Sequence, residues 1–188
     1  MNIELATMHE AGHAVMQWLV GWENIGLQMT VFDLEASHVS ARCPYPSLDT
    51  MSALRKRLLV LFAGNTATRQ RWPNSNNDWG DWQDILRAVQ DHFQRPLGIK
   101  WIVADGRVLQ DVEANDVMQA AMSNCAEIVA QPLIQEAMVR IATAFASVIP
   151  GENGTVRLDG GDVVSACEAV IGQEFRAKNP WSKWIAGK

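Results

Sequence analysis

The chain of 188 residues is 48% hydrophobic and 20% charged, a composition typical of one globular domain with a full hydrophobic core. Its net charge of −5 and the lack of a large basic run argue against nucleic acid as the main partner. The three cysteines, Cys43, Cys125 and Cys167, form no Cys-x-x-Cys pair, so neither a disulfide framework nor a cysteine zinc site is expected. No apolar run approaches the roughly 20 residues of a membrane span, and no signal peptide is recognised. These features predict a cytoplasmic protein.

Residues 2–20 are predicted to form a helix that carries a His-Glu-x-x-His motif. Because residues four apart share one helix face, His9 and His13 can hold one metal ion between them. Glu10 lies at the edge of that face, where it can act on a metal-bound water as a general base. Gly12 leaves room for another element to approach the helix closely. The motif therefore predicts a zinc hydrolase, the alternative being polar residues on a solvated helix face.

The next segments alternate between strand and helix patterns. Apolar residues at every second position predict two antiparallel strands within residues 25–43, joined near residues 33–37. Residues 48–71 are predicted to form a helix that Ser47 or Asp49 caps. The expected strand pair directly follows the motif helix, so it is expected to lie beside the metal site.

The second half of the chain is predicted to be mainly helical. Ala104-Asp105-Gly106 marks a turn between two short strands. Helices are expected over residues 81–95, 116–130, 132–148 and 159–175. The whole pattern predicts a mainly α (α+β) domain over residues 1–175. A basic, Trp-containing tail, residues 176–188, is expected to be mobile or packed at the periphery.

Catalytic zinc usually takes three protein ligands and keeps one position open. No histidine follows His13 within its helix, which excludes the three-histidine class and predicts a carboxylate from another helix. By position alone several side chains remain candidates: Asp78, Asp81, Asp84 and His92, with Glu113 and Glu127 more remote.

The segment His9-Glu10-Ala11-Gly12-His13-Ala14 resembles the motif of the FtsH-type zinc metalloproteases, and further likeness extends over about residues 3–172. Residues 61–67 are similar to a Leu-x-Gly-Gly-x-Ala-Ala segment of that family, and residues 157–163 to its turn into a last helix. Residues 80–88 match the spacing of its Gly-x-x-Asn-Asp-Leu-x-x-Ala segment. The Asp of that segment is the family's third zinc ligand, so the resemblance implies Asp84 in this role.

The chain also departs from the family pattern. Thr68 stands where the family usually has an acidic residue. Any contact that this acid makes to the metal site in the family is therefore not expected in this chain. The sequence contains neither a Gly-x-x-x-x-Gly-Lys-[Ser/Thr] motif nor the family's membrane segments. ATP-driven unfolding by this chain is therefore not expected, and a homo-oligomer or a separate ATPase partner remains compatible with the resemblance.

Together these patterns predict a zinc metalloendopeptidase that cleaves unfolded or flexible polypeptides. One zinc ion is expected on His9, His13 and Asp84, with Glu10 as the general base. An extended substrate is expected to add to the edge strand within residues 25–43.

Two alternatives remain at the level of the sequence. One is a non-catalytic binding or adaptor protein that keeps a metallopeptidase fold, and the other is a hydrolase of non-peptide substrates. The intact Glu10 argues against the adaptor, because a structural metal site needs no general base. His38 and His92 have no spaced partner and are expected to be ordinary histidines rather than groups that stabilise an oxyanion.

Overall fold

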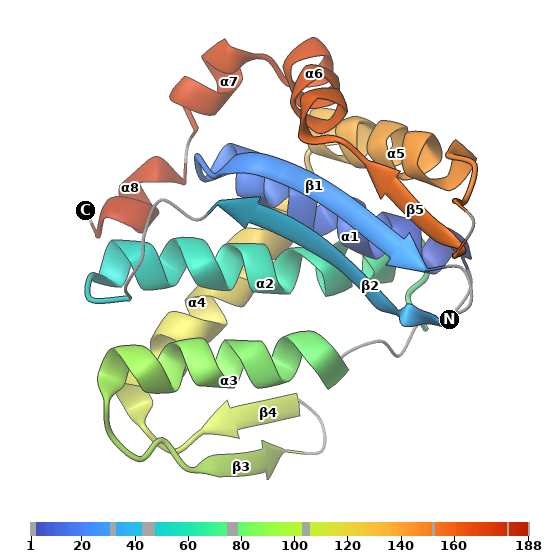
Figure 1. Ribbon diagram of the computed structural model, residues 1–188. Helices are drawn as coiled ribbons and strands as arrows, with labels where there is room; N and C mark the ends of the chain where they lie inside the picture. The colour runs from blue at the N-terminus through green and yellow to red at the C-terminus, as the bar shows by residue number, and fades with distance from the viewer. Residues whose placement is uncertain are drawn as a thin grey trace.

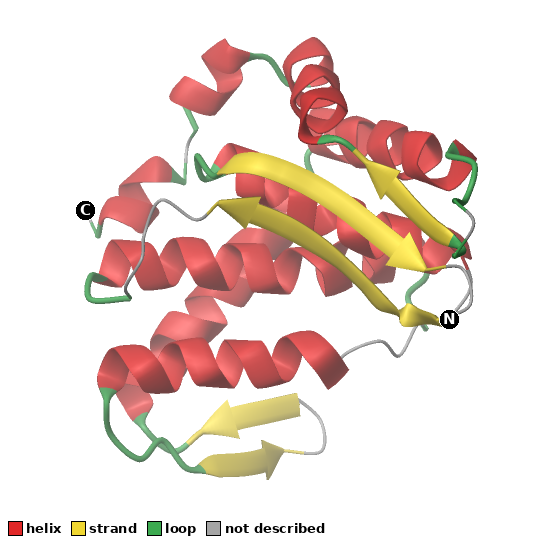
Figure 2. Ribbon diagram, in the orientation of Figure 1, coloured by secondary structure: helices red, strands yellow, loops and turns green. Residues whose placement is uncertain are grey.

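The computed structural model describes residues 3–30, 33–42, 48–74, 79–102, 106–151, 153–179 and 181–187. The helices are α1 (Ile3–Leu19), α2 (Met51–Arg71), α3 (Trp79–Phe93), α4 (Val112–Val129), α5 (Pro132–Ser147), α6 (Gly160–Val170), α7 (Gln173–Ala177) and α8 (Ser182–Ala186). The strands are β1 (Glu23–Thr30), β2 (Asp33–Arg42), β3 (Ile99–Ile102), β4 (Gly106–Leu109) and β5 (Thr155–Leu158). The predicted mainly helical class with antiparallel strands is confirmed (Figure 2).

Helix α1 lies at the centre of the molecule, between the sheet and the helices α2 and α5 (Figure 1). Every residue from Ala6 to Leu19 is buried except His9, which is partly exposed. The sequence predicts a single buried stripe, whereas the helix is enclosed on all sides. Small residues allow neighbours to approach it from several directions: Ala6, Ala11, Gly12 and Ala14.

The backbones of α1 and α2 are in close contact at Gly12. A Cβ atom on Gly12 would lie 2.6 Å from the carbonyl oxygen of Ala63 and 2.9 Å from Cβ of Ala67. The predicted close approach at this glycine is therefore confirmed. It places the motif of α1 directly beside the middle of α2.

The cap of α2 differs from the prediction. The side chain of Thr50 accepts a hydrogen bond of 3.1 Å from the backbone N–H of Ala53, so Thr50 rather than Asp49 is the N-cap of the helix; Ser47 lies outside the described residues.

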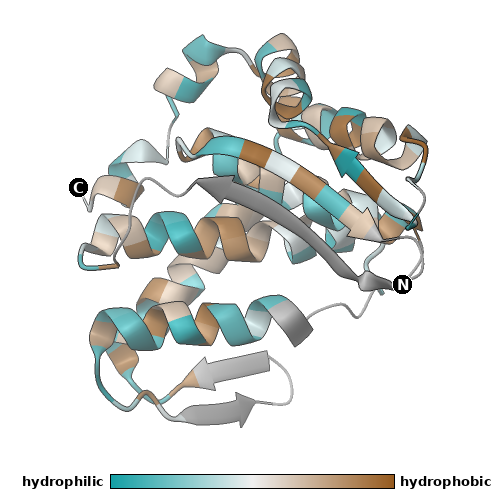
Figure 3. Cartoon of the chain, viewed as in Figure 1, coloured by the Kyte–Doolittle hydropathy of each residue, from teal (hydrophilic) through white to brown (hydrophobic). Residues whose placement is uncertain are grey.

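The three-stranded sheet has the order β2-β1-β5, and both pairings are antiparallel. Ile25, Leu27 and Met29 are buried, whereas Gly26 and Gln28 between them are only partly buried, so β1 shows the predicted alternation (Figure 3). Thr30 pairs with Asp33, which places the turn ahead of Asp33. The prediction of a turn at residues 33–37 is wrong, because these residues continue into β2.

Strand β5 is not predicted by the sequence. Its four residues pair with β1, from Leu27 opposite Leu158 to Thr30 opposite Thr155. The strand leads directly into α6, where the sequence predicts a helix start at Asp159. A Cβ on Gly160 would lie 2.4 Å from the carbonyl oxygen of Ile25, so α6 begins in contact with β1.

The expected second hairpin is present between α3 and α4. Strands β3 and β4 pair antiparallel, with Ile102 opposite Gly106, and the turn between them lies outside the described residues. At its base, Arg95 donates to the carboxylates of Asp111 and Glu113, which ties the end of α3 to the start of α4.

The tail predicted over residues 176–188 packs against the rest of the chain through α8. Trp181 and Ile185 are buried, and Nη1 of Arg55 in α2 donates a 2.6 Å hydrogen bond to the carbonyl of Trp184. Among the described residues, none of the helices combines the length and the apolar character that crossing a membrane requires.

Candidate metal centre

The two motif histidines of α1 point the same way, as their spacing predicts. Their Nε2 atoms lie 3.0 Å apart, and the ring centroids are 4.6 Å apart in an edge-to-face arrangement. Nδ1 of His13 donates a 2.7 Å hydrogen bond to the carbonyl of Val60 in α2. This bond fixes the ring and leaves Nε2 as the nitrogen that faces a ligand.

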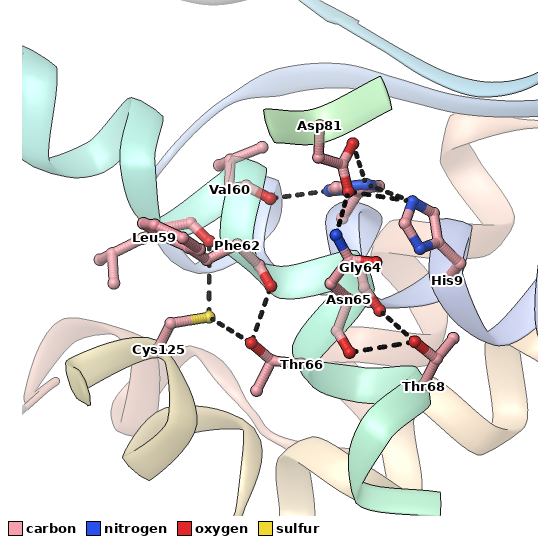
Figure 4. Close-up of polar contacts among 11 residues, drawn as sticks. His9, Leu59, Val60, Phe62, Gly64, Asn65, Thr66, Thr68, Asp81 and Cys125 are labelled. Carbon is pink, nitrogen blue, oxygen red and sulfur yellow. Dashed lines mark hydrogen bonds and ion pairs between the residues drawn. The ribbon is translucent and has the colours of Figure 1, made fainter. Parts of the chain in front are cut away.

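A carboxylate from the first turn of α3 completes the group. Oδ2 of Asp81 lies 3.2 Å from Nε2 of His9, and Oδ1 lies 3.4 Å from Nε2 of His13 (Figure 4). Ligand atoms of these three residues all lie within 4.8 Å of one another, close enough to hold one metal ion. The structure thus brings together two nitrogens and one carboxylate from α1 and α3.

The carboxylate at the site is Asp81, not Asp84, which the family resemblance implies. Oδ1 of Asp84 instead accepts a 3.1 Å hydrogen bond from Nη1 of Arg87, and its side chain is 47% exposed. Because α3 reaches the imidazoles with its first turn, a residue three positions later lies farther along the helix axis. Asp81 therefore replaces Asp84 as the candidate third ligand.

The other sequence candidates lie elsewhere or outside the description. Nδ1 of His92 is hydrogen-bonded to the carbonyl of Leu48, and Glu113 is paired with Arg95. Glu127 is exposed on α4. Asp78 and the side chain of His38 fall outside the described residues.

The donor set and the space around it fit zinc. Two imidazoles and a carboxylate are a usual set for catalytic zinc, and a tetrahedron with metal–ligand bonds of about 2.0–2.1 Å has edges of about 3.3–3.4 Å. The Nε2–Nε2 distance of 3.0 Å is close to such an edge. Nε2 of His9 lies 3.2 Å from Oδ2 of Asp81 and Nε2 of His13 lies 3.4 Å from its other oxygen, Oδ1, so either oxygen is near enough to be the third ligand atom. A Cβ on Gly64 would lie 2.4 Å from Nε2 of His13 and 2.8 Å from Nε2 of His9, so this glycine keeps α2 clear of both nitrogens.

Two neighbours of the site on α2 were not predicted from the sequence. Nδ2 of Asn65 donates a 3.2 Å hydrogen bond to Oδ2 of Asp81 (Figure 4). The carbonyl of Val60 could not have been found, because any residue type supplies a carbonyl. Asn65 gives one signal only, its position directly after Gly64 in the segment that resembles the family.

Thr68 occupies the position at which the family usually has an acid. Its buried hydroxyl donates within α2, to the carbonyls of Gly64 at 3.3 Å and Asn65 at 3.0 Å. Nδ1 of His9 is buried and has no hydrogen-bond partner among the described residues. The two imidazoles are therefore held differently, His13 by the Val60 carbonyl and His9 by packing and Asp81.

The charges of the site are strongly coupled in the absence of a metal. Burial lowers the pKa of His13, but the nearby carboxylate and hydrogen bond of Asp81, together with Glu10, outweigh it and raise this pKa to about 9. Burial raises the pKa of Asp81, but attraction and hydrogen bonds from His13 and His9 hold it well below its usual range. A proton on His13 thus occupies the position that a metal ion would take, and metal binding would release it.

Glu10 lies on the same helix turn and is buried, with 3% of its surface exposed. It contributes to the attraction that raises the pKa of His13, which places its carboxylate in the electrostatic environment of the site. From this helix turn, the carboxylate of Glu10 can accept a proton from a water held near the two imidazoles and Asp81.

No family model matches the sequence, and no curated protein matches it either.

Proposed function

We propose that the protein is a zinc metallopeptidase in which His9, His13 and Asp81 hold one zinc ion and Glu10 is the general base. The observation that carries this proposal is the convergence of the two imidazoles and the carboxylate of Asp81, with Glu10 buried on the same turn of the helix that bears both histidines. The sequence likeness to the FtsH-type peptidase domain supports it. A structural metal site would need no buried glutamate in this position.

A zinc ion bound here would lower the pKa of a coordinated water to about 7 and polarise the scissile carbonyl. Glu10 would take the proton of that water and pass it to the leaving amine. His13 would keep its ring orientation through the Val60 carbonyl. Asp81 would balance part of the positive charge.

The sheet offers a place for a polypeptide substrate. Strand β2 is at the edge of the described sheet, and α1, which carries the motif, packs against it. An extended peptide would add to β2 through backbone hydrogen bonds, which demand little of its sequence. Unfolded or flexible chains are therefore the substrate class that fits.

The test is cleavage of unfolded β-casein by the zinc-loaded protein and by a Glu10→Gln variant. The variant should keep one zinc per chain and lose cleavage by at least about 100-fold, the lower end of what a general base contributes. Addition of a chelator should abolish cleavage by the unsubstituted protein, and restored zinc should recover it.

Glu4→Gln is the matched control, because Glu4 is an exposed residue of the same helix. It should cleave at the unsubstituted rate. Full activity of Glu10→Gln would rule out the mechanism. One bound zinc with no cleavage by the unsubstituted protein would favour the non-catalytic adaptor.

A further inference from the structure

Asn65 connects the ligand on α3 to the helix that also supports the ligands on α1. Its side-chain Nδ2 lies 3.2 Å from Oδ2 of Asp81, and the same oxygen lies 3.2 Å from Nε2 of His9. Asp81 belongs to the first turn of α3, and the residues directly ahead of that helix, 75–78, are outside the description. Within the part of the chain that the structure describes, the hydrogen bond from Asn65 ties the Asp81 carboxylate to α2.

The direction of this bond follows from the chemistry of the two groups. A carboxylate only accepts hydrogen bonds, so the amide must turn its NH₂ group toward Asp81. The bond uses one lone pair of Oδ2 and leaves Oδ1 and the remaining lone pairs for a metal ion. Hydrogen bonds to an ionised acceptor are stronger than those between neutral groups, so the carboxylate is held firmly.

The neutrality of the amide matters as much as its position. A lysine or arginine could also hold the carboxylate, but its positive charge would repel a divalent cation a few ångströms away. Asn65 supplies a donor without charge. It lies next to Gly64, which keeps space for the imidazoles, and five residues beyond Val60, whose carbonyl orients His13.

We infer that Asn65 is a positioning residue for the metal, which acts by holding the Asp81 carboxylate in its ligating orientation. This inference rests on the proposed function, which supplies the metal site itself. It adds that Asn65 increases the affinity of that site for the metal. Partners of ligating groups typically contribute a factor of about 10–100 to metal affinity.

The experiment measures zinc affinity by competition with a chromophoric chelator. Asn65→Ala and the similarly sized, better helix-forming Asn65→Leu should both lower the affinity by about 10–100-fold. The control is Asn124→Ala, since Asn124 is also a partly buried helical asparagine, whose Nδ2 donates to the carbonyl of Ala120 in its own helix. This control should bind zinc as the unsubstituted protein does.

Two further measurements separate positioning from a purely structural role. The metal-free Asn65 variants should unfold within a few degrees of Asn124→Ala. Their Co²⁺ complexes should differ from the unsubstituted complex in visible absorption, which reports ligand number and geometry. In an Asp81→Asn background, Asn65→Ala should change zinc affinity by no more than about twofold, because its effect passes through Asp81.

Unchanged zinc affinity in both Asn65 variants would overturn the inference, as would an equal loss in the Asp81→Asn background. If the unsubstituted protein bound no zinc, the assignment of Asn65 would be wrong together with the site. If it bound zinc without cleaving casein, the proposed peptidase activity would fail while the role of Asn65 could still be upheld or refuted by the affinities.

Discussion

Asp81 and Asp84 lie one helical turn apart on α3 and have different surroundings. The Asp81 side chain is 16% exposed and contacts both imidazoles, whereas that of Asp84 is 47% exposed and paired with Arg87. Surface ion pairs of the second kind contribute little free energy and leave the carboxylate in contact with water. The geometry therefore favours Asp81, whereas the family resemblance in the sequence implies Asp84.

Substitution of each aspartate by asparagine tests this difference directly. Asp81→Asn should lower zinc affinity by more than the roughly 100-fold that loss of an outer contact can cost, because it removes a charged ligand. Asp84→Asn is the matched control and should bind zinc with nearly unchanged affinity, as measured by chelator competition. A reversed result would assign the ligand to Asp84, as the family resemblance implies.

Part of the site was predictable at this scale and part was not. His9, His13 and Glu10 follow from one short motif, because the spacing along a helix gives the two histidines a common face and puts Glu10 at its edge. Asp81 was among the candidates, but no rule of spacing states which turn of α3 would reach α1. That choice depends on how two helices distant in the sequence pack, which the sequence pattern does not encode.

The contact between α1 and α2 depends on two glycines with different neighbours. A Cβ on Gly12 would meet backbone, the Ala63 carbonyl oxygen at 2.6 Å, whereas a Cβ on Gly64 would meet the imidazole rings of His9 and His13. Backbone cannot move without separating the helices, whereas the imidazole rings can be displaced at the cost of their contacts with the Val60 carbonyl and Asp81. Substitution at the two glycines should therefore affect different properties.

Gly12→Ala should reduce the free energy of unfolding by about 1–3 kcal/mol through overpacking. Gly64→Ala should reduce this stability by less than Gly12→Ala does and abolish high-affinity zinc binding, because the methyl group occupies the space beside both Nε2 atoms. Denaturant unfolding of the metal-free variants and zinc titration measure the two effects.

Gly161→Ala provides the control for both glycines, since a Cβ there meets nothing within 4 Å in α6. It should bind zinc normally and should not lose stability, because alanine favours a helix over glycine by up to about 1 kcal/mol. Normal zinc affinity in Gly64→Ala would show that the imidazoles do not need this space.

The helices and strands themselves were largely predictable from the sequence, and the predictions that failed have a common physical cause. The predicted ends of α1 and α5 each lie within one residue of the observed ends. Periodicity and caps are local signals, so they can be read from the sequence. Strand β5 has only four residues and exists through its pairing with β1, more than a hundred positions earlier in the chain. A strand that short carries no pattern of its own.

At the scale of the whole molecule, the C-terminal segment belongs to the packed body. Ile185 in α8 is 7% exposed, whereas Ile149, which follows α5, is 87% exposed. The cation–π contact between Arg55 and the Trp184 ring, at 5.3 Å, adds to the attachment of α8 to α2.

The same substitution at these two isoleucines measures that attachment. Ile185→Ala should lower the free energy of unfolding by about 2 kcal/mol, the lower end of the range for buried isoleucines, because α8 is short and peripheral. Ile149→Ala should change it by less than about 0.5 kcal/mol. Equal small effects in thermal unfolding would mean that the segment is loosely attached.

The position of the three candidate ligands has a mechanical consequence. His13 is near the middle of α1 and Asp81 is in the first turn of α3, so one ion bound by both would cross-link the chain and close a long loop that contains β1, β2 and α2. Cross-links of this kind restrict the unfolded chain, and a disulfide that closes a long loop contributes about 2–4 kcal/mol. A bound zinc ion would then stabilise the fold as well as take part in catalysis, and its loss would loosen α3 together with the hairpin that follows it.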